Sequence, residues 1–265
     1  MRNSLTAEDS TSGTADEAVG QQVSSIVDRI SSAISLGMIT VGERLPVELE
    51  LASQFGVAVA TLRKALARMR SQGIVETRRG RNGGTFVVKA PFPSSKSLRQ
   101  SLARTSIASL RDLADEHAAI SGAAARLAAQ RTAPTQSLRL AELAFRTREA
   151  RGSQERSLAE SRFHIEIAVL SHSQRLLTSE QRLQSEVAPL LWNEDLQVLS
   201  TQLEFNKHLQ IVMAIEQGRA EEAQLAAEQH VMENMRHIVQ MKLELPESLT
   251  GKEQHTRTTR ARRGI

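Results

Sequence analysis

Apolar residues in the first third of the chain recur at intervals of three and four, which is the period of one helix face. This pattern predicts amphipathic helices over residues 19–37, 46–55 and 59–72. The inward positions of the first helix are Val23, Ile26, Val27, Ile30 and Ile34, and those of the third are Leu62, Leu66 and Met69. Gly37, Gly56 and Gly73 follow the three periodic stretches, as expected for residues that end helices.

The pattern then changes to short β-branched stretches. Residues 74–77 and 85–88 are predicted to be two strands, with Gly83 and Gly84 supplying positive φ at the turn between them. Three helices followed by a hairpin is the order of a winged helix-turn-helix, which we assign to residues 19–89. The next stretch contains two prolines and several serines and lysines, and it predicts a linker at residues 90–98.

Beyond the linker almost every stretch has the helical period. Helices are predicted near residues 106–132, 135–151, 154–171, 174–191, 196–217 and 219–243. About six helices of this length favour an antiparallel bundle over residues 99–243, so the chain is expected to be mainly α. Residues 1–18 are polar and rich in Ser and Thr, which predicts a disordered arm, and residues 244–265 form a basic, polar tail.

Composition narrows the classes of function. The 265 residues suffice for two domains, and the absence of cysteine excludes disulfides, thiolate zinc sites and thiol nucleophiles. No apolar run reaches the length of a membrane span, and the N-terminus lacks an apolar signal core, so a cytoplasmic protein is expected. Aromatic residues make up 3% and tyrosine is absent, which disfavours platforms for single-stranded bases and leaves duplex DNA as the better-suited polyanion.

Positive charge is concentrated in residues 59–81, although the net charge of the whole chain is only +4. Residues 59–81 hold one acid, Glu76, and seven basic residues: Arg63, Lys64, Arg68, Arg70, Arg78, Arg79 and Arg81. One interpretation is a solvated basic helix with a charged hairpin that protects a sheet edge. The order of turn, helix, glycine-rich tip and linker favours the other interpretation, which is binding to double-stranded DNA.

The candidate DNA contacts divide into two kinds. Thr61, Arg63 and Lys64 lie early in the predicted reading helix, where side chains meet base edges in the major groove or clamp phosphates. Arg68, Arg70 and the hairpin arginines Arg78, Arg79 and Arg81 are predicted to contact phosphates, which fix register without reading sequence. Gly83 and Gly84 would let the hairpin backbone approach a groove closely.

The stretch GERLPVELELASQFGVAVATLRKALARMRSQGIVETRRGRNGGTFV resembles the amino-terminal domain of the GntR family of bacterial regulators. The specific elements are LP-x-E, LA, FGV, TLRKAL and GGTFV. The resemblance implies a DNA-binding transcription factor, by default a repressor. The chain departs from the family pattern at Leu49, where an arginine is usual, and at Ala58 and Val59, where a serine-arginine pair is usual.

Four ionisable residues in the helical half form a second candidate site. Glu160 and His164 are one helical turn apart, and His208 and His230 lie in the last two predicted helices, each histidine beside apolar positions. Three imidazoles and a carboxylate suit a divalent Zn, Ni, Fe or Mn ion. Each histidine could instead be a core residue bonded to a backbone carbonyl, since spacing alone does not show that the helices meet.

The helical half resembles the FCD ligand-binding domain of FadR-like GntR regulators, through ARLAAQRT (125–132), E-x-x-x-H (160–164) and the surroundings of His208 and His230. The resemblance implies that Glu160, replacing the usual Asp, holds a metal with His164, His208 and His230 on the floor of an effector pocket. An R-x-x-x-E pair usual in these domains becomes His117 and Ser121, and a usual asparagine becomes Ser173. His117 and Ser173 are therefore candidate pocket residues, with an organic acid as a candidate effector.

Three functions follow from these sites. The favoured one is a homodimeric, ligand-responsive repressor that binds a palindromic operator, with a metabolite near the metal altering the spacing of the DNA-binding heads through the linker. The second is a metal-dependent enzyme, for which the sequence offers no convincing general base, although His117 or Glu166 could be proposed, so no catalytic residue is expected. The third is a metal-free regulator whose bundle only dimerises.

Overall fold

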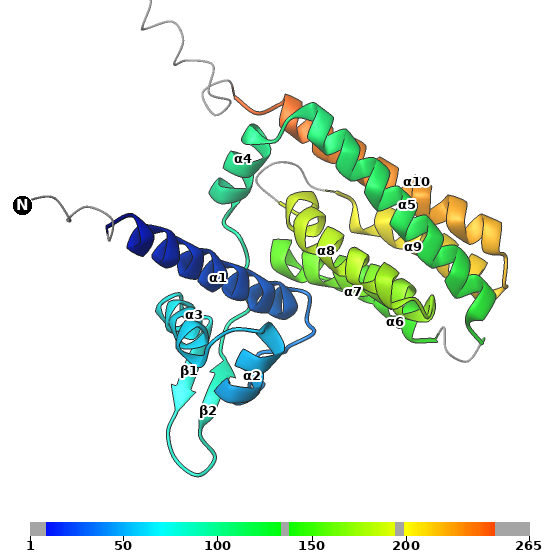
Figure 1. Cartoon of the computed structure of the whole chain (residues 1–265). Helices are drawn as coiled ribbons and strands as arrows, with labels where there is room; N and C mark the ends of the chain where they lie inside the picture. The colour runs from blue at the N-terminus through cyan, green and yellow to red at the C-terminus, as the bar shows by residue number, and fades with distance from the viewer. Residues whose placement is uncertain (1–8, 134–137, 194–198, 247–265) are drawn as a thin grey trace, which may run out of the picture. The chain divides into compact units, whose positions relative to one another are not determined.

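The computed structural model describes residues 9–133, 138–193 and 199–246 of the chain (Figure 1). The chain divides into two compact units, one that ends at Pro91 and one that begins at Phe92. Each unit has its own hydrophobic core, so each is described by itself.

The first unit is a winged helix-turn-helix, as predicted. Its elements are α1 (Asp9–Ser35), α2 (Glu48–Phe55), α3 (Val59–Ser71), β1 (Val75–Arg78) and β2 (Gly84–Val87). The strands pair antiparallel, with Val75 opposite Val87 and Arg78 opposite Gly84. Gly56 ends α2 in the left-handed conformation, with φ of 66°, and its backbone N–H closes the last turn.

The core of this unit is built from the helix faces that the apolar pattern predicts. Ile26, Ile30 and Ile34 of α1 pack with Leu62 and Met69 of α3, and all are buried. Burial of each such side chain contributes roughly 1.5–3 kcal/mol. The packing orients α3 so that its basic side chains remain on the outside.

The predicted disordered arm at residues 1–18 is wrong for its second half, because α1 already begins at Asp9. Residues 1–8 lie outside the described part of the chain. Once the packed stretch from Val23 onward forms a helix, each further residue at its N-terminus adds a hydrogen bond at little cost.

Every element described in the second unit is a helix, which confirms the predicted bundle. The helices are α4 (Ser95–Arg104), α5 (Ile107–Arg131), α6 (Leu138–Glu149), α7 (Gly152–Leu170), α8 (Gln174–Leu191), α9 (Thr201–Glu216) and α10 (Ala220–Leu243). Helices α5 and α10 lie side by side, α7 packs on α8, and α6 packs on α9 (Figure 1). None of the described helices is both long and apolar enough to cross a membrane.

Helix α4 corrects the linker predicted at residues 90–98, whose last four residues are helical. Ser94 caps this helix by accepting a 3.2 Å hydrogen bond from the Ser97 backbone N–H. Leu98 and Leu102, one turn apart, are buried against α8 and α10. Lys242 of α10 donates to the backbone carbonyl of Leu102 at 2.9 Å, which ties the end of α4 to the bundle. The serines that resembled a linker therefore begin a helix.

The predicted basic tail at residues 244–265 lies outside the described residues from position 247 onward. Its first residue, Glu244, is the C-cap of α10.

Candidate metal centre and nucleic-acid interface

Helices α7, α9 and α10 bring the four predicted metal ligands to one point inside the second unit. Glu160 and His164 come from α7, His208 from α9 and His230 from α10. Each residue is 3% exposed or less. The histidines therefore belong to one buried cluster, which their spacing in the sequence did not establish.

The donor atoms face one another. The Oε1 atom of Glu160 lies 3.2 Å from the Nε2 atoms of both His164 and His230, and 3.7 Å from that of His208. The Nε2 atom of His230 lies 3.1 Å from that of His164 and 3.3 Å from that of His208. Three ring nitrogens and one carboxylate oxygen thus surround a common centre.

This spacing fits a metal ion better than it fits direct hydrogen bonds. Ligands about 2.0–2.1 Å from a zinc-like ion lie roughly 3.3–3.4 Å apart in a tetrahedron, and roughly 2.8–3.0 Å apart at adjacent positions of an octahedron. Five of the six separations between the donor atoms are 3.1–3.7 Å, and all four atoms lie within 4.8 Å of one another. Each close Nε2 pair needs one proton between its two nitrogens, and lone pairs left facing each other repel. The cluster could hold a metal at this centre, with all four residues as ligands.

Residues around the ligands fix their orientation. The ring of Phe163 stacks on His208 with centroids 3.9 Å apart. The Oε2 atom of the buried Glu204 lies 3.4 Å from Nδ1 of His230; the two atoms do not form a hydrogen bond as they stand, but they are close on the side where a carboxylate supports a metal-bound histidine. The Nδ2 atom of Asn234 lies 3.2 Å from Nε2 of His230. Neither residue was predicted, although Asn234 falls one turn after His230 on the same helix face.

The local charge holds Glu160 in its ionised form. Burial alone would raise the pKa of Glu160, but the charge of His208 and the contacts with His164 and His230 hold that pKa well below its usual range. A carboxylate that is ionised at this depth needs positive charge beside it. A divalent ion bound at this centre would add such charge.

A second buried polar cluster lies beside the first, and we call it the Glu180 cluster. It consists of His117 and Ser121 of α5 and of Glu180 and Gln184 of α8. The Oε2 atom of Glu180 accepts a 2.8 Å hydrogen bond from Ser121, and its Oε1 atom accepts one of 2.9 Å from Gln184 and lies 3.3 Å from Nε2 of His117. The ring of His117 is 6.2 Å from that of His164, so the two clusters are neighbours.

The Glu180 carboxyl is ionised as well. Burial would raise the pKa of Glu180, but the hydrogen bond and charge of His117, the charge of His164 and the amide of Gln184 lower it. Glu180 and Gln184 were not among the predicted pocket residues. The available signal was their register, because both occupy the same face of α8 as the buried Leu183 and Val187.

Ser173, the other predicted pocket residue, is the N-cap of α8. Its hydroxyl accepts a hydrogen bond from the Leu176 backbone N–H at 3.4 Å. Serine and asparagine are both good N-caps, so the capping role is compatible with Ser173 standing where FCD domains usually have an asparagine.

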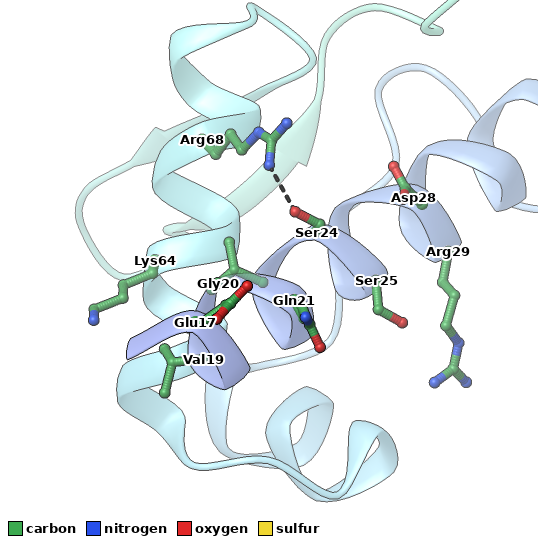
Figure 2. Close-up of a pocket in the computed structure, with 11 residues that line it drawn as sticks. Glu17, Val19, Gly20, Gln21, Ser24, Ser25, Asp28, Arg29, Lys64 and Arg68 are labelled. Carbon is green, nitrogen blue, oxygen red and sulfur yellow. Dashed lines mark hydrogen bonds between the residues drawn. The ribbon is translucent and has the colours of Figure 1, made fainter. Parts of the chain in front are cut away.

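In the first unit, most of the predicted DNA contacts lie on the surface. The exposed residues are Arg63, Lys64, Arg68, Arg70, Arg78, Arg79 and Arg81. Thr61 differs, because it is only 8% exposed. An open groove of about 980 Å³ runs between α1 and α3 and reaches Lys64 and Arg68. Arg68 leans across this groove and donates to the Ser24 hydroxyl at 3.1 Å (Figure 2).

Arg63 is held by an acid from the preceding helix. Its Nε atom donates to Oε2 of Glu48 at 2.6 Å, while 67% of the Arg63 side chain is exposed. Because Glu48 begins α2, this contact links the LP-x-E element to the arginine of TLRKAL. An exposed pair of this kind is weak, so Arg63 can exchange the carboxylate for a phosphate or a base edge.

The tip of the hairpin uses its glycines differently from the prediction. Positive φ occurs at Gly80 (107°) and Gly84 (154°), and the structure does not place Gly83 among the residues of positive φ. Gly83 donates to the carbonyl of Gly80 at 2.8 Å, and a Cβ atom at Gly83 would lie 2.6 Å from the carbonyl oxygen of Arg78. Gly83 is therefore required by close backbone approach and not by a left-handed conformation.

Two family models match the chain in the regions of these two sites. Residues 22–87 match the model described as "Bacterial regulatory proteins, gntR family". Residues 112–233 match the FCD domain. The first match contains the predicted DNA contacts, and the second contains all four members of the metal cluster.

The chain is also similar to proteins that are named as transcriptional regulators and to a solved structure. It is 44% identical over 227 residues to a protein of Mycobacterium gastri described as "Putative HTH-type transcriptional regulator RmpR", covering 85% of this chain and 83% of that one. It is 32% identical to the Glc operon transcriptional activator of Escherichia coli, covering 56% and 54% of the two chains. The solved structure of E. coli McbR/YncC shares the fold, with a TM-score of 0.50, 17% identity and coverage of 83% of this chain and 97% of that one.

Proposed function

The chain belongs to the GntR family of bacterial regulatory proteins and is a DNA-binding transcriptional regulator with a ligand-binding FCD domain; from this premise we propose that it is a metal-containing, effector-controlled homodimer acting on a palindromic operator. The observation that carries the proposal is the convergence of Glu160 and three histidines at one buried point. Exposed basic side chains on α3 and the wing supply the complementary observation for DNA.

The DNA-binding role divides among the exposed residues of the first unit. Arg63 reads a base edge or clamps a phosphate at the N-terminal half of α3, after release from Glu48. Lys64, Arg68 and Arg70 meet phosphates along the same helix. At the wing, Arg79 and Arg81 follow the sugar-phosphate backbone. Thr61 is assigned at most a contact through its small exposed surface.

The metal-binding role falls on the buried cluster formed by helices α7, α9 and α10. Glu160 Oε1 and the Nε2 atoms of His164, His208 and His230 hold one divalent ion, with Zn, Ni, Fe and Mn as candidates. When bound, the ion supplies a Lewis-acidic position that a small oxygen-containing effector can occupy. Glu204 orients His230 through Nδ1, and the stacked ring of Phe163 orients His208.

The effector controls DNA affinity only if it binds one arrangement of the DNA-binding units more tightly than another. Binding between α5, α7 and α8 shifts helices of the bundle, and α4 with the residues before it transmits the shift. The organic acid that the sequence resemblance implied stays a prediction at this stage. A cytoplasmic location follows from action on operator DNA.

Repression is the proposed direction, on the analogy of most family members. The relative named for the Glc operon is described as an activator, so family membership does not decide the sign. A reporter gene under the cognate promoter decides it: expression in a strain that lacks the regulator rises if the protein represses and falls if it activates.

The experiment that tests the proposal is elemental analysis with native mass spectrometry of protein purified without chelators. We expect one divalent ion per chain and the mass of a dimer. His172→Ala serves as the control, because His172 is exposed and is not a member of the cluster, and it should keep the metal. Wild-type protein without metal would contradict the metal-containing pocket, and a monomer that binds operator fragments would contradict the homodimer.

A metal-dependent enzyme was the alternative for the same cluster. The matching families and relatives are transcriptional regulators, and they show that the chain is a regulator and not an enzyme.

A further inference from the structure

The first turns of α2 and α3 carry exposed apolar side chains. Leu49 of α2 is 74% exposed, more than any other large apolar side chain in the described part of the chain. Ala58, the N-cap of α3, and Ala60 in its first turn are exposed as well. We call Leu49, Ala58 and Ala60 the apolar strip. A single apolar residue on a surface is ordinary, but a group of them at a binding surface indicates contact with apolar atoms of the partner.

The apolar strip borders the face of α3 that carries Arg63. Glu48 directly precedes Leu49, and its Oε2 atom accepts a 2.6 Å hydrogen bond from Nε of Arg63, so the start of α2 lies beside the first turns of α3. Ala60 comes three residues before Arg63 and four before Lys64, and all three are exposed, so they share one face of the helix. In a helix-turn-helix, this face enters the major groove.

The N-terminal part of α3 offers a base almost no polar side chain before Arg63. Residues 58–62 are Ala, Val, Ala, Thr and Leu. The polar member, Thr61, is only 8% exposed. Side chains at the start of the second helix are the ones that contact base edges in a helix-turn-helix. The apolar strip has no hydrogen-bond donor or acceptor in its side chains, so it distinguishes bases only through apolar contact.

The major groove presents one apolar group, which is the C5 methyl of thymine. Alanine and leucine side chains can pack on this methyl without leaving a polar group of the protein unpaired. The surrounding charge favours DNA over an apolar protein surface as the occupant, because the basic side chains of the same unit are exposed and suit phosphates. These are Arg63, Lys64, Arg68, Arg79 and Arg81.

We propose that the apolar strip reads thymine methyl groups, so that each DNA site bound tightly by this winged helix-turn-helix contains at least one thymine whose methyl contacts Leu49, Ala58 or Ala60. These three residues then determine sequence specificity together with Arg63. The inference rests on the DNA-binding role proposed for α3, and it does not depend on the metal, the effector or the homodimer.

The test begins with in vitro selection of duplexes from a randomised library by the full-length protein. In the tightest-binding duplex, each thymine is then replaced singly by deoxyuridine, which removes the C5 methyl and keeps every hydrogen-bonding group. Fluorescence anisotropy at one salt concentration measures the affinities. For at least one thymine of the bound site, we expect the replacement to weaken binding about fourfold, the loss for one methyl withdrawn from an apolar contact. Replacement of thymines outside the footprint should have no effect.

Three variants assign the methyl to the apolar strip: Leu49→Ala, Ala58→Gly and Ala60→Gly. All three positions are exposed, so none of these changes opens a cavity in the core. In at least one variant, the same deoxyuridine replacement should weaken binding by less than about twofold, because the contact is already lost. Leu243→Ala is the control. It shortens a leucine that is 71% exposed at the end of α10, and it should keep the full effect of deoxyuridine.

Three results would overturn the inference. The first is an affinity that stays within about twofold of the unmodified duplex for every deoxyuridine replacement. The second is a deoxyuridine effect of the same size in wild type and in all three variants. The third is a selection in which duplexes bind but no sequence is preferred. A protein that retains no duplex would instead remove the DNA-binding role of α3 itself, so the two failures are distinguishable.

Discussion

The two units of this protein use charge in opposite ways. In the winged helix-turn-helix, the basic side chains are exposed, and those with partners are held by weak surface contacts such as Arg63 with Glu48. In the bundle, Glu160, Glu180 and Glu204 are each 2% exposed or less and contact one or more histidines. Exposed charges exchange partners at small cost, whereas buried charges require fixed partners.

This difference separates the two functions physically. A surface that must associate with DNA and leave it again benefits from contacts that are individually weak and sensitive to salt. A site that must recognise one small molecule benefits from fixed groups in a poorly solvated interior, where each interaction is stronger. The comparison therefore predicts that single substitutions in the bundle cause large losses of metal affinity. Single substitutions in the wing should cause small losses of DNA affinity.

The largest effect is expected from loss of a metal ligand. His230→Ala should weaken metal binding by at least about a hundredfold. The free energy of binding a structural zinc ion is typically about 10–16 kcal/mol, so one of four ligands contributes about 3 kcal/mol. Competition with a chromogenic chelator measures the affinity. His172→Ala is the matched control and should bind as wild type. Equal affinities of wild type and His230→Ala would show that His230 is not a ligand.

A smaller loss is expected at Glu204, which touches His230 but not the centre of the cluster. Glu204→Gln should lower metal affinity by roughly 10–100-fold, the usual range for carboxylates that orient a bound histidine. The same chelator competition reports it. Affinity within twofold of wild type would mean that Glu204 serves only its ion pair with Lys207.

In the DNA-binding unit, the largest effect is expected at Arg63. Arg63→Ala should weaken binding to the true operator by about 1–3 kcal/mol, and by much less on random DNA, if Arg63 reads a base. Fluorescence anisotropy with both DNAs at one salt concentration measures the difference. Equal losses on the two would assign Arg63 to a phosphate. The Glu48→Gln variant should be measured alongside, because it removes the carboxylate that pairs with Arg63 in the protein without DNA.

Each wing arginine should contribute a graded electrostatic effect. Arg79→Ala or Arg81→Ala should flatten the slope of log affinity against log salt by about 0.9, the value for one phosphate contact. Binding titrations between low and physiological salt give the slope. Glu76 and Arg78 form a pair within β1, so Arg78→Ala should change the slope less. A slope unchanged in both Arg79→Ala and Arg81→Ala would remove the wing from the interface.

The smallest effect is expected in the pH dependence of stability. The pKa of Glu180 is lower in the folded protein than its ordinary value, so its ionised form stabilises the fold above the unfolded pKa of about 4.3. This contribution is lost as pH falls through the lowered pKa. Denaturant unfolding of metal-free protein should therefore show that the stability gap between wild type and Glu180→Gln is constant from pH 7 to about pH 5 and narrows as the pH falls below about 4. A constant gap would contradict the paired, ionised Glu180.

Periodicity in the sequence predicted most of the fold because most helices bury one continuous apolar face. The boundaries of α3 and α8 were predicted to within one residue for this reason. Helix α4 was missed because its ten residues contain only two large apolar positions and begin among prolines and serines. The N-terminal part of α1 was missed because nothing in its polar composition shows that it extends a packed helix.

The candidate metal residues could be predicted from the sequence, but their neighbours could not. Glu160 and His164 share a helix face, and the resemblance supplied His208 and His230. The sequence did not predict roles for Glu204, Glu180 and Gln184. The partners of a polar side chain on an apolar helix face lie on other helices, so they are known only from the packed structure. The same holds for Arg63, whose contact with Glu48 joins two helices.

The most direct test of the buried metal centre is anomalous X-ray scattering from crystals of protein purified without chelators, recorded on both sides of the absorption edge of the metal found by elemental analysis. One strong peak per chain is expected, bonded to Oε1 of Glu160 and to the Nε2 atoms of His164, His208 and His230. Crystals that lack this peak, with the three imidazoles hydrogen-bonded to one another or to water, would contradict the account.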